Sequence, residues 1–264
     1  MGGVRYCRVR CAALTIIGIT AAFFGPPAVA EVAQKGNLRI AVDARLAPHR
    51  LPRSAPAPVA VSFSGRIGTT DKSGPPQLRT ISIAINRQGR LTRRGLPLCR
   101  AGKIDPSTTS DALMACRPSL VGDGSFAANV KLPQQSPFPS KGKVLAFNGR
   151  FRGRPAILAH IYGTSPVPTS YVLPFLIDTR GGTYRTVLEA SLPRVTGDWG
   201  YVTGISMTLD RRFSFRGRQQ SYLAADCPAP AGFPGAVFPL LQTNFAFVDG
   251  KRVTSTLTRR CTVR

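Results

Sequence analysis

Apolar and polar residues alternate along most of this chain, with the period of two that is typical of β-strands. The clearest stretch lies at 81–86, where three isoleucines alternate with serine, alanine and asparagine. Strands are also predicted at 38–43 and 59–65. From residue 126 onward the same pattern recurs at 127–132, 144–147, 156–162, 171–177, 184–190, 201–209 and 219–225. A strand roughly every 10 to 15 residues predicts an all-β chain, folded as an antiparallel sandwich or open barrel.

Glycine dipeptides mark the expected turns between these strands. Three of them are Asn148-Gly149, Gly181-Gly182 and Arg216-Gly217. The strongest hairpin signal is Asp249-Gly250, because both residues tolerate the positive φ of a type I′ turn. If that turn is two residues long, Val248 faces Lys251 and Ala246 faces Val253.

One short helix is predicted near 106–116. Asp105 can cap its N-terminus, Pro106 suits its first position, and Pro118 ends it. The 26 glycines and 23 prolines of the chain argue against long helices elsewhere.

The first thirty residues have the pattern of a secretory signal peptide. Arginines at 5, 8 and 10 precede an apolar stretch at 11–24, and Ala28-Val29-Ala30 forms an A-x-A cleavage motif. We therefore expect Sec-type export with cleavage after Ala30, and a secreted, extracellular protein. An uncleaved membrane anchor is the alternative. No later apolar stretch is long enough to span a bilayer.

The exported part, 31–264, is expected to form a single domain. Its N-terminal portion, 36–58, is proline-rich towards its end and is expected to be extended. A division into two domains near 133–139 is the alternative.

Four cysteines remain after cleavage: Cys99, Cys116, Cys227 and Cys261. An even number of cysteines in an exported chain predicts disulfides. Four cysteines allow three pairings, and we favour Cys99–Cys116 with Cys227–Cys261 because each pair is nearest in sequence. The cysteines lack the C-x-x-C spacing of a zinc site, so no metal is expected.

Catalytic residues are scarce. A Ser-His-Asp triad is not expected, since His49 lies in the proline-rich stretch and His160 lies within an apolar strand. Glu189 with Asp198 or Asp210 could form the carboxylate pair of a glycoside hydrolase, but ion pairs with the abundant arginines are the stronger expectation. We expect no cofactor and favour a non-catalytic protein, with an extracellular carbohydrate-active hydrolase as an alternative.

The chain is strongly basic, with a formal net charge of +24 at pH 7. Signal cleavage would leave 33 of the 36 basic residues against 12 acidic ones. Such a charge attracts polyanions. The alternative is that the arginines reflect the composition of a GC-rich genome and serve only solubility.

Two stretches, 148–154 and 210–218, interleave arginine with phenylalanine, and such surfaces bind anionic polymers by charge and stacking. If the stretches are extended, alternation places three arginines of each on one side: Arg150, Arg152 and Arg154, and Arg212, Arg216 and Arg218. The alternative is a hairpin with a solvated arginine face and a buried phenylalanine face. Trp199 is either a sugar-stacking platform or a core anchor.

Segments 227–239 and 257–261, together with 78–86 and 95–99, resemble a group of uncharacterised secreted proteins from high-GC Gram-positive (actinobacterial) bacteria. This resemblance implies no known activity and makes two disulfides more credible. We therefore expect a cell-envelope or extracellular protein with a binding or structural role. Its partners would be anionic envelope polymers, without specific recognition of nucleic acid. A dedicated polyanion-binding module is a further alternative.

Overall fold

The computed structural model of the protein describes residues 30–192 and 200–264. β-Strands make up most of these residues. The strands are β1 (Glu31–Lys35), β2 (Leu38–Ala47), β3 (Arg50–Leu51), β4 (Ala57–Pro58), β5 (Ala60–Thr69), β6 (Leu78–Asn86), β7 (Gly89–Leu91), β8 (Cys99–Arg100), β9 (Leu120–Val130), β10 (Phe138–Phe151), β11 (Arg154–Gly163), β12 (Thr169–Thr179), β13 (Tyr184–Ser191), β14 (Gly200–Leu209), β15 (Arg212–Phe215), β16 (Arg218–Ser221), β17 (Leu223–Ala225), β18 (Gly235–Phe247) and β19 (Arg252–Val263). The α-helix α1 spans Thr109–Cys116 and is flanked by the 3-10 helices η1 (Ala101–Lys103) and η2 (Arg117–Ser119). The predicted all-β class is confirmed.

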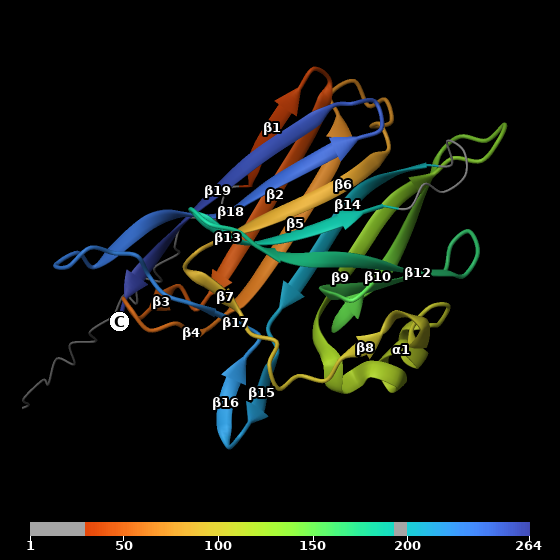
Figure 1. Ribbon diagram of the computed structural model, residues 1–264. Coiled ribbons are helices and arrows are strands. Elements are labelled where there is room, and N and C mark those ends of the chain that lie inside the picture. Colours follow the sequence, from red (N-terminus) through yellow and green to blue (C-terminus); the bar gives the residue numbers. More distant parts are fainter. Residues whose placement is uncertain (1–29, 193–199) are drawn as a thin grey trace, which may run out of the picture.

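The described strands form one curled, fourteen-stranded sheet with the order β1-β2-β5-β14-β9-β10-β11-β12-β13-β6-β18-β19-β3, in which β8 also pairs with β10. Two small sheets, β15-β16 and β4-β17-β7, accompany it. Among these strands only the short β8–β10 and β19–β3 pairs are parallel. The curl brings β19 beside β1 and β2, near the opposite end of the sheet order (Figure 1).

Polar contacts join the two ends of the curled sheet. The Thr258 amide donates to Glu31 Oε1 at 3.3 Å. Arg259 Nη2 lies 2.7 Å from Asp43 Oδ1, and Arg259 Nε donates to the Ala44 carbonyl at 2.7 Å. The side chains of this ion pair are only 17% and 19% exposed, so little water competes for them. The last strand is therefore held to the second by a shielded ion pair.

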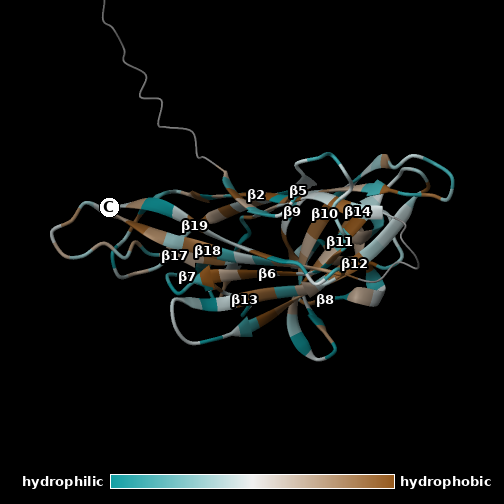
Figure 2. Cartoon of the chain, turned by 90° about the horizontal axis from the view of Figure 1, so that it is seen from above, coloured by the Kyte–Doolittle hydropathy of each residue, from teal (hydrophilic) through white to brown (hydrophobic). Residues whose placement is uncertain are grey.

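Hydrophobic positions gather along the strands, while the loops are mainly hydrophilic (Figure 2). In β6 and β18 the inward residues Ile81, Leu241 and Phe245 are buried, as period-two alternation predicts. Strands β10 and β11 differ, because 144–149 and 156–161 are buried without interruption. Their second face is covered by α1 and its flanking turns, which form a separate apolar cluster with Phe147 and Leu158. Two-sided burial explains their continuous apolar runs.

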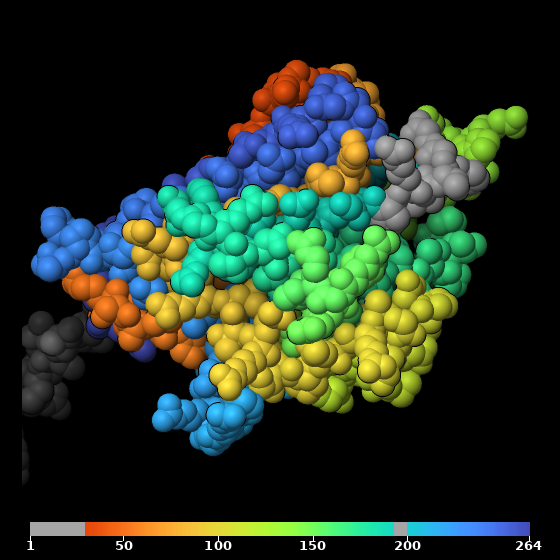
Figure 3. Space-filling view, in the orientation of Figure 1, coloured from red at the N-terminus to blue at the C-terminus, as the bar shows by residue number. Residues whose placement is uncertain are grey.

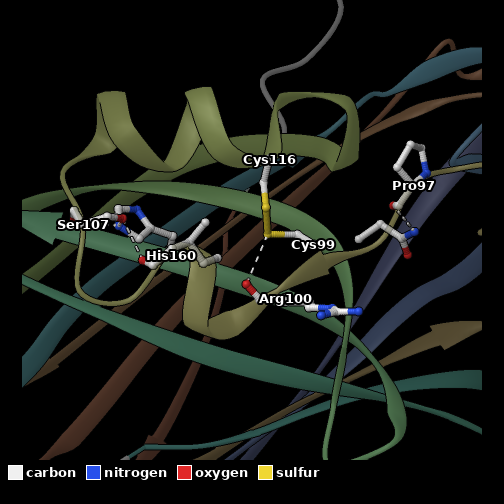
Figure 4. The surroundings of a disulfide bond; sticks show 8 residues. Pro97, Cys99, Arg100, Ser107, Cys116 and His160 are labelled. Atoms are coloured by element: carbon white, nitrogen blue, oxygen red, sulfur yellow. Dashed lines mark hydrogen bonds between the residues drawn. A yellow bond between two sulfur atoms is a disulfide. The ribbon is translucent and has the colours of Figure 1, made fainter.

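Both expected disulfides are confirmed. Cys99–Cys116 joins β8 to the end of α1 (Figure 4), and Cys227–Cys261 joins the segment after β17 to β19. Their Cα–Cα distances are 5.5 and 5.7 Å, within the normal range for a disulfide.

The helix begins three residues later than its expected first position at 106. Asp105 is not its cap, because it lies in a bend four residues before the first helical residue. Thr108 is the cap instead. Its hydroxyl oxygen accepts from the Asp111 amide at 3.2 Å, and the Asp111 carboxylate accepts from the Thr108 amide at 3.4 Å. This capping box starts the helix at Thr109.

The C-terminal hairpin exists, but its two-residue turn was wrong. Ala246 faces Arg252, and three residues, 248–250, form the loop. The Phe247 amide donates to the Lys251 carbonyl at 2.9 Å, and Asp249 Oδ1 accepts from the Lys251 amide at 3.0 Å. The aspartate side chain therefore holds the chain in a longer turn than the dipeptide alone predicts.

The Asn148-Gly149 turn was also wrong, since both residues lie within β10 and are buried. Asn148 Nδ2 donates to the Pro97 carbonyl at 3.0 Å. A Cβ on Gly149 would lie 2.9 Å from the Cys99 carbonyl oxygen, so glycine lets β8 approach. The true turn follows four residues later, at Arg152-Gly153.

Candidate anion-binding surface

The two hairpins that carry the predicted arginines end in the same four residues, Phe-Arg-Gly-Arg, at 151–154 and 215–218. In the β10–β11 tip, Arg152 and Gly153 have φ of 48° and 77°, and in the β15–β16 tip Arg216 and Gly217 have φ of 52° and 71°. Positive φ at both central residues defines a type I′ turn, which matches the twist of a hairpin. The repeated tetrapeptide marks both turns in the sequence, although only Arg216-Gly217 was predicted as a turn.

In each tip the turn arginine lies over the preceding aromatic ring. The guanidinium carbon of Arg152 is 5.3 Å from the Phe151 ring centroid, and that of Arg216 is 5.4 Å from the Phe215 centroid. Both distances are within the range of cation–π contacts. Both arginines are exposed, so the rings hold the charges at the tips without removing them from solvent.

One loop, residues 92–98, contacts both hairpins. On one side Gly95 lies against Phe215, where a Cβ would collide with the ring. On the other side the Leu96 and Pro97 carbonyls accept from Asn148 of β10. The chain then enters β8, which places Arg100 opposite Arg150.

These contacts bring separate basic segments together. Figure 3 shows the loop (yellow) beside the β10–β11 tip (green), with the β15–β16 tip (blue) projecting beyond it. We call the exposed arginines of these segments the arginine face: Arg94, Arg100, Arg150, Arg152, Arg212, Arg216 and Arg218.

The structure therefore unites five of the six predicted arginines but changes their arrangement. Neither stretch is extended throughout, because each one turns back at its Arg-Gly pair. The sixth residue, Arg154, is bound to Asp178, with its Nη2 2.6 and 2.9 Å from the two carboxylate oxygens. Within the described residues no ion pair involves the arginine face. Its charge is therefore free to meet a ligand.

The residues considered for hydrolysis do not form a carboxylate pair in the part of the chain that the structure describes. Glu189 lines a groove on the outer face of the sheet, and the described lining contains no second carboxylate. Asp210 follows β14 and is not part of this lining. Asp198 and Trp199 lie outside the described residues.

His160 lies fully buried in β11, beneath the loop that leads into α1 (Figure 4). Its Nε2 is 3.0 Å from the Ser107 carbonyl and 3.2 Å from the Ser107 hydroxyl. That hydroxyl donates to the Ile104 carbonyl at 2.8 Å, so Nε2 carries the proton and donates. The imidazole therefore fixes a loop and is not placed to take a proton from Ser107. His49 is exposed.

Burial lowers the pKa of His160 below its ordinary value of 6.5, although Ser107 and Asp105 oppose that shift. The unfolded chain therefore takes up a proton near pH 6.5 that the folded chain does not. We expect stability to fall as the pH drops below 6.5, by at most about 1.4 kcal/mol per pH unit for this one group. Urea unfolding between pH 5 and 7.5 measures this pH dependence of the free energy of unfolding. His160→Gln, which keeps a donor at the Nε2 position, should lose this dependence. His49→Gln should keep it, and an unchanged profile in His160→Gln would contradict the assignment.

No group of three or more histidine, cysteine or acidic side chains suited to a metal ion lies in 30–192 or 200–264. In the same ranges no helix is long and apolar enough to cross a membrane. Comparisons with models of known families, with curated proteins and with solved structures gave no match for this chain.

Proposed function

We propose that this chain is a non-catalytic extracellular binding protein that holds anionic polymers of the cell envelope on its arginine face. The observation that carries the proposal is the pair of identical hairpin tips, each with an exposed arginine stacked on a phenylalanine ring. The loop at 92–98 contacts both hairpins.

This arrangement suits a polymer better than a small ligand. Each tip is a short type I′ hairpin, so its arginine is held in place before binding and loses little freedom. Several phosphates or carboxylates along one chain can meet several arginines, and each contact releases a counterion. The tips are narrow turns without a recognition helix, so we propose no specific reading of nucleic acid.

An extracellular location agrees with two features. Both disulfides belong to an oxidising compartment, and the first thirty residues have the pattern of a signal peptide. The resemblance to secreted actinobacterial proteins points to the envelope of a high-GC Gram-positive bacterium. We propose export, cleavage after Ala30 and retention at the envelope by anionic polymers.

Binding of residues 31–264 to poly(glycerol phosphate) should decrease linearly with salt on a double-logarithmic plot. If about five phosphates are neutralised, affinity should drop about 100-fold between 50 and 200 mM salt. Retention on immobilised polymer or titration calorimetry measures this, with neutral dextran as the control. An affinity that does not change with salt concentration, or equal retention on dextran, would contradict the proposal.

A further inference from the structure

A groove of about 630 Å³ runs across the outer face of the sheet, over β13, β6 and β18. The pairing of these strands sets side chains in rows. Glu189 of β13 faces Ser82 of β6, and Ser82 faces Asn244 of β18. One row further along, Ala84 faces Gln242. The floor of the groove therefore combines one carboxylate with neutral polar and small side chains.

Arginines line both ends of this groove. Arg79 and Arg252 belong to the end near Thr80, since Arg252 faces Ala246 and Ala246 faces Thr80. Arg180 follows β12 and lines the end near Ala84, since Asp178 of β12 faces Val187 and Val187 faces Ala84. Arg252 in β19 and Arg180 at the end of β12 are also four strands apart in the sheet, or about 19 Å across the strands.

The charged groups of the groove are free to bind. Within the described residues, no ion pair or side-chain hydrogen bond engages Glu189 or the three arginines. The Gln242 and Asn244 amide nitrogens donate to Thr256 and Thr254, both at 3.2 Å, which leaves their amide oxygens as acceptors.

We infer that this groove binds a short, linear, hydroxyl-bearing anion with an acidic group towards each end. The arginines at the ends bind the acidic groups, and hydroxyls between them donate to the Glu189 carboxylate and to the amide oxygens. Acidic oligosaccharides and oligomers of a polyol phosphate share this chemistry. A chain of phosphates without hydroxyls is disfavoured, because it would place negative charge against Glu189.

This site is distinct from the arginine face and does not depend on it. Binding at the groove can be measured apart from binding at the arginine face in a protein that carries Arg152→Ala and Arg216→Ala. These substitutions remove the two stacked turn arginines. In that background we expect the groove to retain its ligand. Titration calorimetry uses four probes: tetragalacturonate, a glycerol phosphate tetramer, tetrapolyphosphate and neutral maltotetraose.

Arg180→Glu or Arg252→Glu should each weaken the two hydroxyl-bearing anions at least tenfold. Glu189→Ala should weaken these anions and strengthen tetrapolyphosphate, a change of opposite sign that a general loss of charge cannot produce. Arg66→Glu, at an exposed position of β5 outside the groove, is the matched control and should leave all four titrations unchanged.

Amide chemical shifts of Ser82 and Asn244 locate the ligand independently of any substitution. Shifts in these residues with one hydroxyl-bearing anion and not the other would identify its source as a glycan or a polyol phosphate. Equal binding of maltotetraose and the anions, or unchanged affinity in both arginine variants, would overturn the inference. Loss of all tetragalacturonate and glycerol phosphate binding in the Arg152→Ala, Arg216→Ala background would also overturn it, and would leave the arginine face as the binding surface.

Discussion

Replacing Cys227 and Cys261 together with alanine should lower the free energy of unfolding by about 4 kcal/mol. The bridge closes a sequence separation of 34 residues, and the loop-entropy relation gives about this value. Both cysteines are fully buried, so the loss of their packing adds to the effect. Urea unfolding of both proteins measures the difference.

The matched control is the other disulfide. Replacing Cys99 and Cys116 opens a separation of 17 residues, for which the same relation gives about 3 kcal/mol. The two variants should also differ in the part of the protein that is destabilised. Hydrogen exchange should rise in β19 and β3 for the first pair, and in α1 for the second. Equal stability losses with faster exchange in α1 for both pairs would contradict the structural roles assigned to them.

Local alternation made much of this fold predictable. Ile81, Ile83 and Ile85 alternate with serine, alanine and asparagine, and the structure pairs that strand on both sides. The nearest-neighbour pairing of the cysteines was also correct. The strand could be predicted because its alternation lies within a few neighbouring residues. The disulfides could be predicted because the exported part has four cysteines and each pairs with the one nearest in sequence.

Features that depend on contacts between distant segments were not predictable in this way. Asn148-Gly149 has the composition of a turn, but β8 approaches it from fifty residues away and keeps it in a strand. The helix start is a local exception, because it is set by a capping box between Thr108 and Asp111, three residues apart, and not by Asp105. Strand β1 was not predicted, since Glu31–Lys35 has no buried side chain and is held by its ladder with β2.

The same distinction applies to the candidate sites. The arginine face could be predicted in part, because the sequences of its two hairpins interleave arginine with phenylalanine. The role of the loop at 92–98 in joining the hairpins could not be predicted, since nothing in the sequence near Gly95 indicates a contact with Phe215. The groove was not visible at all, because Arg79, Arg180 and Arg252 meet only after three distant segments have folded.

Reversing the charge of both hairpin tips, with Arg152→Glu and Arg216→Glu, should reduce affinity for poly(glycerol phosphate) about 100-fold or more at 50 mM salt. Each substitution removes one charge-assisted contact, worth about 1.5–3 kcal/mol, and adds repulsion. The slope of log affinity against log salt should become shallower by about 1.5, because two fewer counterions are released. Stability should change little, since both side chains are exposed.

Two further variants separate a binding surface from a merely basic protein. Arg39→Glu with Arg66→Glu makes the same change in net charge at exposed positions of β2 and β5, away from the tips. If total charge alone attracts the polymer, this pair weakens binding as much as the tip pair does, and the arginine face has no special role. Arg152→Lys with Arg216→Lys keeps the charge but weakens stacking on Phe151 and Phe215. We expect a loss of several-fold with the salt slope preserved, because the stacked geometry, and not the charge, is what changes.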